Sequence, residues 1–305
     1  MKKTLITSAL LALGLIANAQ IANKSNWVTP YENAIATVSG NTVTFEIDHY
    51  AESEEIVKFN KISNNKYSIT RTKDTWSFSE DAKFVELQTI NNKKYLFVKD
   101  DKNNILEFFE NTNSEEQTFE LDVMNKPYNL LLNGDYVDEN GKKYKIDNGT
   151  ITIGGKEYSY TLAEQMYFIM QSDYCTFYWE TSTTGINLYY TQQGEYTTEK
   201  GKLFHKLKNV SPQGRWTFLS DEIVRNQALW RFDNKTLRIM RNEIYARHGW
   251  IFNSADLKSY FSAQPWYHPG TDNNKIKLSQ IEEINVNIIK NFEKQENRPM
   301  DEGLK

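Results

Sequence analysis

The chain has little cysteine, proline and glycine, and it lacks long apolar runs. Cys175 is the single cysteine among 305 residues, which include 6 prolines and 14 glycines. One cysteine cannot form an intramolecular disulfide, so the fold must depend on packing alone. After the first 19 residues no stretch approaches the roughly 18 consecutive apolar residues of a membrane-spanning helix. We therefore expect no disulfide, no membrane span after the N-terminal segment, and a buried strand position for Cys175.

The first 19 residues have the three regions of a secretory signal peptide. Lys2 and Lys3 form a positive start, Leu5 to Ile16 form an apolar run, and Ala17-Asn18-Ala19 form a small-residue cleavage site. As a helix the apolar run is about 18 Å long, too short for a hydrocarbon core of about 30 Å. We expect cleavage before Gln20, which is not the cysteine that a lipid anchor needs. The protein is therefore expected to be exported, and to be periplasmic, on the cell surface or secreted.

Recognisable catalytic and metal-binding patterns are also missing. There is no Gly-x-Ser-x-Gly elbow and no His-Glu-x-x-His, and His49 and His205 stand alone. Gly149 to Lys156 does not have the spacing of a phosphate-binding loop, so we interpret it as a hairpin. His248 and His268 lack a third histidine or a cysteine as a further ligand, so we expect no metal and no cofactor. The sequence leans toward a protein that is not an enzyme.

Charge divides the chain near residue 210. Residues 20–210 carry 20 Lys and Arg against 28 Asp and Glu, a net charge of −8, whereas residues 211–305 carry 14 against 12, a net charge of +2. Seven of the eight arginines follow Gly214, and arginine suits bidentate and stacked contacts. A net charge of +2 is too small for the basic stripe that nucleic acid requires, so we expect no nucleic acid partner.

Residues 20–210 have the composition of an antiparallel β-rich region. Aromatic and β-branched residues occur in short runs from Val43 to Leu207, separated by Asn, Asp and Gly, with no long period of 3.6 residues. Turn signals divide Tyr136 to Leu162 into short strands such as Lys143 to Ile146 and Thr150 to Ile153. We expect sandwich or small barrel modules here.

A weak internal echo favours two similar modules in this region. Leu96-Phe97-Val98 and Ile105 to Phe109 resemble Phe177-Tyr178-Trp179 and Ile186 to Tyr190 at an offset of 81 residues. The alternative is that any two aromatic hairpins look alike. The expected parts of the exported chain are modules at about 24–125 and 126–210, a helical domain at 211–298 and a flexible tail at 299–305.

Three helical segments are predicted after Gly214. Each has apolar residues three and four apart and a capping residue at its start. The first helix has the apolar residues Leu237, Met240 and Ile244 and is capped by Asp233 or Asn234. The second has Leu257 with Tyr260 or Phe261 and starts near Asn253 or Ser254. The third has Ile281, Ile284, Ile288 and Phe292 and starts with a capping box of Ser279 and Glu282. Gly249 and Pro265 end the first two helices. The expected fold class is α+β and segregated, with an antiparallel β-rich region followed by a small helical domain.

The first of these helices ends in a recognisable pentapeptide. Tyr245-Ala246-Arg247-His248-Gly249 is followed by Trp250-Ile251-Phe252, Tyr260-Phe261 and Pro265-Trp266-Tyr267. On these motifs residues 215–295 resemble the YARHG domain family, with Trp250 in place of the expected tyrosine. The resemblance implies an extracellular bacterial protein, and it implies no established activity.

The side chains of this motif allow a functional and a structural interpretation. The candidate ligand-binding residues are Arg238, Arg241, Tyr245, Arg247, His248, Trp266 and Tyr267, whose aromatic members offer surface for a sugar or a peptide. In the structural interpretation the aromatic residues fill a small core, and Arg241 and Arg247 bind carboxylates or helix carbonyls. Glu243 and Arg247 are also placed to form an i,i+4 pair. We favour the structural interpretation.

Three functions are compatible with these features. The leading hypothesis is a noncatalytic binding module that recognises cell-wall glycan or a surface protein, because the chain carries an export signal and an aromatic, arginine-rich C-terminal part without catalytic motifs. The second is an envelope hydrolase in which His248 acts with a nearby acid and Arg241 clamps charge. The third is a structural accessory subunit of a surface complex.

Overall fold

The computed structural model describes residues 20–49, 53–71, 78–112, 121–163, 167–170, 176–191 and 201–295. The predicted signal peptide, Cys175 and the predicted tail at 299–305 lie outside these residues. The chain divides into two compact units, Met1–Gln117 and Thr118–Lys305. The boundaries near 125 and 210 stay predictions. Within the described ranges, no helix has the length and apolar character needed to cross a membrane.

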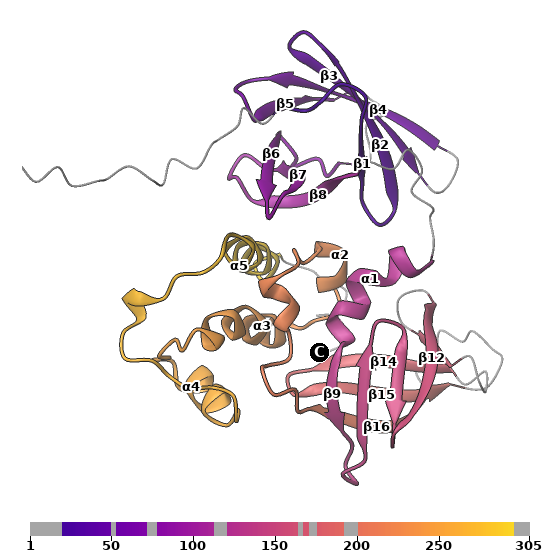
Figure 1. The fold of residues 1–305 in the computed structure, drawn as a ribbon, viewed down its shortest axis with the longest axis vertical. Helices are drawn as coiled ribbons and strands as arrows, with labels where there is room; N and C mark the ends of the chain where they lie inside the picture. The colour runs from indigo at the N-terminus through magenta and orange to yellow at the C-terminus, as the bar shows by residue number, and fades with distance from the viewer. Residues whose placement is uncertain are drawn as a thin grey trace, which may run out of the picture. The chain divides into compact units, whose positions relative to one another are not determined.

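The first unit contains eight described strands that close into an antiparallel barrel (Figure 1). Each strand pairs with the next along the chain, and the last pairs with the first. The strands are β1 (Ser25–Val28), β2 (Glu32–Ser39), β3 (Thr42–His49), β4 (Ser53–Lys61), β5 (Lys66–Thr70), β6 (Phe84–Ile90), β7 (Lys93–Lys99) and β8 (Ile105–Thr112). Alternate residues of β3, namely Val43, Phe45 and Ile47, are buried inside, as a strand period of two requires. The rings of Phe45 and Phe109 meet edge to face with centroids 5.2 Å apart.

The second unit contains another antiparallel barrel of eight described strands with the same order. The strands are β9 (Gly134–Val137), β10 (Lys143–Asp147), β11 (Thr150–Ile153), β12 (Lys156–Ala163), β13 (Tyr167–Met170), β14 (Thr176–Ser182), β15 (Gly185–Thr191) and β16 (Lys202–Asn209). The strands predicted at 143–146 and 150–153 are confirmed, and the segment 149–156 is a hairpin rather than a phosphate-binding loop. Of the two predicted architectures, the barrel is the one found.

The internal echo does not align corresponding strands of the two barrels. Its hairpins are β7 with β8 and β14 with β15. These are the seventh and eighth strands of the first barrel, but the sixth and seventh of the second. The similarity of the two modules therefore rests on their shared topology and not on the aromatic hairpins.

Helix α1 (Leu121–Leu132) lies in the region where no helical period was expected. Pro127 sits inside it, and proline removes a helical hydrogen bond and clashes with the preceding turn, so the local pattern argues against a helix. Contacts with the second barrel override that preference. The Asn125 side chain donates to the carbonyl of Leu162 at 2.7 Å, and the Tyr160 hydroxyl donates to Asn129 at 3.0 Å. Packing against β12 therefore stabilises a helix that its own sequence disfavours.

The C-terminal helices follow the second barrel in the same unit. They are η1 (Thr217–Ser220), α2 (Asn226–Leu229), α3 (Asn234–Arg247), α4 (Ala255–Ser262), η2 (Asn273–Lys275) and α5 (Gln280–Phe292). The three predicted helices are confirmed as α3, α4 and α5, with Asp233 capping α3 and a capping box of Ser279 and Glu282 starting α5. The segregated α+β fold class is confirmed. The short helices η1, α2 and η2 have too few turns for a periodic pattern and were not predicted.

The turn between β14 and β15 contacts the helices. The Tyr260 hydroxyl of α4 donates to the carbonyl of Thr183 at 3.0 Å, and Thr181 donates to the carbonyl of Arg231 at 2.8 Å. Position 185, the first residue of β15, requires glycine, because a Cβ there would lie 1.8 Å from the carbonyl oxygen of Leu207. The second barrel and the helices therefore share a hydrogen-bonded boundary.

The buried contacts of α1 predict the effect of removing Asn125. The Asn125→Ala substitution leaves the Leu162 carbonyl without its donor and should lower the free energy of unfolding by about 1–3 kcal/mol. The matched control is Lys126→Ala, since the neighbouring Lys126 is exposed and should change it by about 0.5 kcal/mol or less. Urea unfolding of residues 20–305 measures both. Equal effects of the two substitutions would show that α1 is not held by this bond.

Candidate functional site

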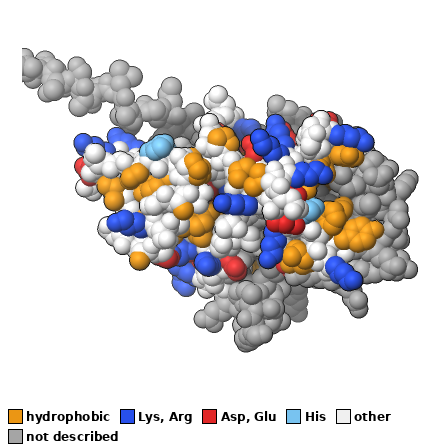
Figure 2. Space-filling view, turned by 90° about the horizontal axis from the view of Figure 1, so that it is seen from below, with side chains coloured by type: hydrophobic (Ala, Val, Ile, Leu, Met, Phe, Trp, Pro, Cys, Tyr) orange, Lys and Arg blue, Asp and Glu red, His pale blue; other side chains and the backbone are white. Residues whose placement is uncertain are grey.

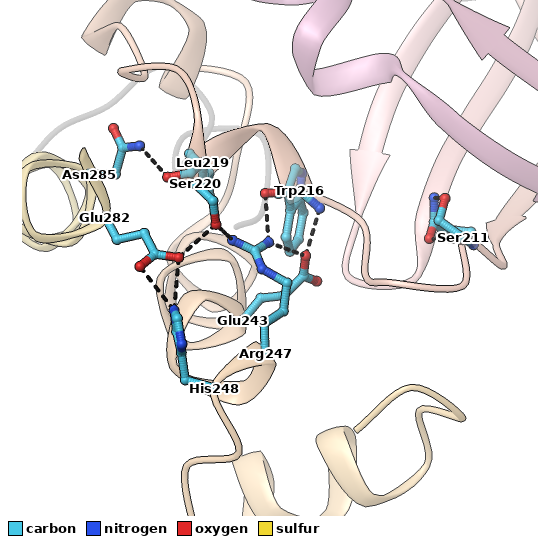
Figure 3. Close-up of polar contacts among 10 residues, drawn as sticks. Ser211, Trp216, Leu219, Ser220, Glu243, Arg247, His248, Glu282 and Asn285 are labelled. Atoms are coloured by element: carbon cyan, nitrogen blue, oxygen red, sulfur yellow. Dashed lines mark hydrogen bonds and ion pairs between the residues drawn. The ribbon is translucent and has the colours of Figure 1, made fainter. Parts of the chain in front are cut away.

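An i,i+4 pair on α3 holds both polar backbone groups of Trp216. The N–H of Trp216 donates to Glu243 at 2.6 Å, and its carbonyl accepts from Arg247 at 2.9 Å (Figure 3). Arg247 also lies 3.5 Å from Glu243, so the predicted pair is present. The indole of Trp216 is fully buried. The segment before η1 is thereby fixed against the last turns of α3.

This pair is buried rather than exposed on the helix surface. The side chain of Glu243 is 1% exposed and that of Arg247 is 13% exposed. Burial raises the pKa of Glu243, while the charge of Arg247 and the backbone N–H donors oppose that rise. Gly214 makes room for the carboxylate, because a Cβ at this position would lie 2.8 Å from Glu243 Oε1. A charge pair so far from water is costly to break.

A second set of bonds runs from Arg247 to His248 through the start of α5. Arg247 donates to the hydroxyl of Ser220 at 2.8 Å, and that hydroxyl donates to Glu282 Oε1 at 2.6 Å. Nε2 of His248 lies 2.9 Å from each carboxylate oxygen of Glu282. Figure 3 shows Glu282 between Ser220 and His248. The last residues of α3 are therefore tied to both η1 and α5.

The hydrogen bonds to Glu282 decide its ionisation. Burial alone would raise the pKa of Glu282, but bonds from Ser220, the Ser279 N–H and His248 outweigh it and hold the pKa below its ordinary value. A carboxylate only accepts hydrogen bonds, so Nε2 of His248 must carry a hydrogen. No described residue hydrogen-bonds the other ring nitrogen, Nδ1, and the His248 side chain is 35% exposed. One edge of this ring is fixed and the opposite edge is available to a ligand.

The arginines predicted as ligand-binding residues form ion pairs. Arg241 makes a bidentate contact with Glu293, the residue that caps the end of α5, at 2.7 and 3.1 Å, and both side chains are largely buried. Arg238 pairs with Asp256 near the start of α4, and this pair is exposed. These residues and Arg247 connect α3 to its neighbours, as the structural interpretation expected.

The predicted aromatic residues pack against one another. Tyr245 and Trp250 meet edge to face with ring centroids 5.2 Å apart. The Tyr267 hydroxyl donates to the carbonyl of Trp250 at 2.6 Å, and Trp266 packs edge-on against Phe261 at 6.0 Å. Tyr245, Trp250, Trp266 and Tyr267 are each half-buried, so they contribute to the small core and leave only partial faces exposed.

The serine, histidine and acid of this region do not have the order of a catalytic triad. In a triad the histidine stands between the serine and the acid and removes the serine proton. Here Glu282 stands between Ser220 and His248, and the Ser220 hydroxyl donates to the carboxylate. Arg241 lies seven residues before His248 on α3, about 10 Å along the helix axis, and its guanidinium is occupied by Glu293. The structure therefore places an acid, Glu282, against His248 but leaves Arg241 bonded to a different carboxylate.

A polar cavity lies beside the histidine of the motif. Its volume is about 410 Å³, and it is lined by His248 and Gly249 and by residues of the segment 270–277, including Asp272, Lys275 and Lys277. The wall is held in place because the Gly270 N–H donates to the carbonyl of Gly249 at 2.7 Å. Among the candidates from the sequence, His248 alone lines this cavity.

Two residues of this site have roles that the sequence did not indicate. Asn285 is fully buried, donates to the carbonyls of Leu219 and Glu222, and accepts from the Val224 N–H at 2.8 Å. Glu282 was predicted only as part of a capping box. Their partners are more than 30 residues away in the sequence, so no local pattern could have identified them.

The sequence suggested that His205 stands alone, but in the structure it lies beside two carboxylates. Its Nδ1 is 3.1 Å from Glu139 and 3.8 Å from Asp138. Hydrogen bonds from the backbone and from Tyr144 outweigh burial and lower the pKa of Asp138, whose carboxylate orders the turn after β9. The turn and strand β16 are thus connected by this group, which supports the barrel end.

Metal ligands and basic stripes are not evident around these sites. Within the described ranges there is no group of three His, Cys, Asp or Glu side chains placed to hold a metal ion. On the face drawn in Figure 2, Lys and Arg side chains stand singly or in small groups among apolar and uncharged ones.

The buried pair predicts a large difference between two arginines of α3. Arg247→Ala removes the cation that pairs with the buried Glu243 and should lower the free energy of unfolding by about 3–5 kcal/mol. Arg238→Ala removes an exposed pair from the same helix and should leave the urea midpoint nearly unchanged. Similar midpoints for the two variants would mean that the Glu243–Arg247 pair does not hold α3 in place.

The lowered pKa of Glu282 predicts a pH dependence of stability. An acid whose pKa is lowered by folding stabilises the protein above its ordinary pKa of 4.5, and this contribution is lost as the pH falls through the folded value. The stability difference between the wild type and Glu282→Gln should therefore be largest near neutral pH and shrink below 4.5. Chemical denaturation at several pH values measures it, with the exposed neighbour Glu283→Gln as control. A difference that does not vary with pH would exclude this role of the carboxylate.

Comparisons with known proteins identify the C-terminal helices. Residues 216–294 match the family model of the YARHG domain. No curated protein matches the chain. A solved structure from Nostoc punctiforme, a protein of unknown function from the DUF3598 family, aligns with 10% identity over 50% of this chain and 72% of its own, with a TM-score of 0.15. This structural similarity is too low to carry an argument. The region that contains η1 and α2 to α5, with the Arg247 and His248 contacts at its centre, is a YARHG domain.

Proposed function

We propose that this chain is exported and acts as a noncatalytic binding module that recognises cell-wall glycan. The observation that carries the proposal is that neighbouring residues of the motif have different roles. Arg247 bonds to Trp216 and Ser220 inside the fold, while His248 and Gly249 line a polar cavity. A motif used in this way supports binding rather than turnover.

The chemistry of the cavity favours a hydroxyl-rich ligand. Its wall offers charged and hydroxyl side chains and backbone groups, with Ile276 as the apolar member. Sugars are recognised by such fixed polar groups, because each hydroxyl both donates and accepts hydrogen bonds. The signal peptide proposed at residues 1–19 and the extracellular occurrence implied by the YARHG resemblance would bring the cavity to the envelope, where such glycans are found.

The hydrolase alternative has weaker support. General base catalysis needs a nucleophile or a water within hydrogen-bond reach of the base. The Ser220 hydroxyl is bonded to Arg247 and Glu282 rather than to Nδ1 of His248, the ring nitrogen that Glu282 leaves open. The other class of partner is a surface protein. Binding of the protein to purified cell wall distinguishes a glycan partner from a protein partner.

The proposal is tested by sedimenting residues 20–305 with purified peptidoglycan sacculi. We expect the protein to be retained in the pellet and to release no soluble muropeptides over prolonged incubation. Retention should fall when soluble muropeptides compete, since the site is a cavity of finite size.

Two outcomes would overturn the proposal. Release of muropeptides that His248→Ala abolishes would make the protein a hydrolase. Absence of retention on sacculi, together with crosslinking to one protein on intact cells, would make it a protein-binding subunit of the surface.

A further inference from the structure

We propose that the cavity beside His248 binds the carboxylate of an acidic envelope ligand, and that Lys275 and Lys277 recognise its charge. This inference rests on the proposed function and adds the chemical class of the ligand. It depends on three features of the cavity: its charge, the fixed orientation of His248 and the rigidity of the wall.

The charge of the cavity favours an anion. Lys275 and Lys277 are exposed at its wall, and of the lining residues only Asp272 is acidic. The Asp272 carboxylate already accepts the N–H of Asn274 at 2.9 Å as the cap of η2. The lining therefore carries two ammonium groups against one carboxylate, a net charge of +1 that favours an incoming anion.

His248 presents a defined edge to the same cavity. Both oxygens of Glu282 lie 2.9 Å from Nε2, which holds the ring in one orientation, and no described residue hydrogen-bonds Nδ1. Nδ1 is therefore the ring atom that can form a hydrogen bond with an incoming ligand. The histidine thus adds a directed bond to the less directional attraction of the two lysines.

The wall that carries the lysines is fixed before any ligand arrives. Asn273 donates to the carbonyl of Ile251 at 3.0 Å and accepts the Ile251 N–H at 2.7 Å. Gly249 has a φ of +79°, and a Cβ there would lie 3.0 Å from the carbonyl oxygen of His268. Glycine at this motif position allows the two segments to approach. A wall that is already ordered spends little binding free energy on ordering.

The size of the cavity limits the ligand to a small unit. A volume of about 410 Å³ falls at the lower end of ligand sites and suits one sugar ring or a short peptide stem. Both units occur in acidic form, as a carboxylated amino sugar or as a peptide carboxylate. The shared chemistry is the carboxylate, and the two sources are distinguished by experiment.

The test compares acidic and neutral probes by isothermal titration calorimetry on residues 20–305. N-acetylmuramic acid is paired with N-acetylglucosamine, which lacks its carboxylate, and N-acetyl-D-alanyl-D-alanine is paired with its C-terminal amide. We expect at least one acid to bind about tenfold more tightly than its neutral partner. The acid that does so identifies the source of the carboxylate.

Matched charge variants locate the binding. The double variant Lys275→Gln/Lys277→Gln should weaken binding of that acid about tenfold. The control Lys258→Gln/Lys290→Gln removes two exposed lysines from α4 and α5 that do not line the cavity, so the net charge changes equally. It should bind like the wild type.

Several results would overturn the inference. These are equal affinity for acid and neutral probes, tighter binding of inorganic phosphate than of either acid, or equal losses in the two double variants. If no probe binds but the protein still sediments with sacculi, the carboxylate site is wrong while the proposed function stands. If sedimentation also fails, the proposed function fails with it.

Discussion

The C-terminal helices depend on one buried guanidinium. Arg247 bonds to the carbonyl of Trp216 and the hydroxyl of Ser220, and its charge faces Glu243, which accepts the N–H of Trp216. The two charges are nearly removed from water, and each lowers the cost of burying the other. A small helical domain has limited apolar surface to bury, and directed bonds of this kind fix one arrangement of α3 against η1 where packing alone would permit several.

Because of this constraint, neighbouring side chains of the pentapeptide point in different directions. Arg247 points into the boundary with Trp216, whereas His248 points toward α5 and exposes one ring edge to the cavity. Gly249 then reverses the chain with a positive φ and receives the Gly270 N–H on its carbonyl. Three successive residues thus serve three purposes: a buried pair, a ring oriented toward a ligand and a turn that forms the wall.

The elements were predictable where the signal is local, and the site was not, because its contacts are distant in sequence. Asp233, the stripe of α3 and the capping box at Ser279 identified helices correctly, since caps and periodicity act within a few residues. Helix α1 was missed because Pro127 opposes it locally and β12 stabilises it from outside the segment. The partner of Arg241 lies far along the chain, as Glu293 is 52 residues away. The sequence identified Arg241 and His248 as candidates but could not show that Arg241 is bound to the glutamate at the end of α5 and His248 to one at its start.

Glu282 connects the stability of the domain to the proposed ligand. Its Oε2 accepts the Ser279 N–H at 2.8 Å to start α5, and both of its oxygens face Nε2 of His248. Any shift of the first turn of α5 would therefore rotate the histidine ring and change the edge that faces the cavity. By linkage, a ligand that binds only the correctly oriented ring must stabilise the start of α5 by the same free energy. The carboxylate that orients the ring is thus a positioning group for the proposed ligand, which does not contact it.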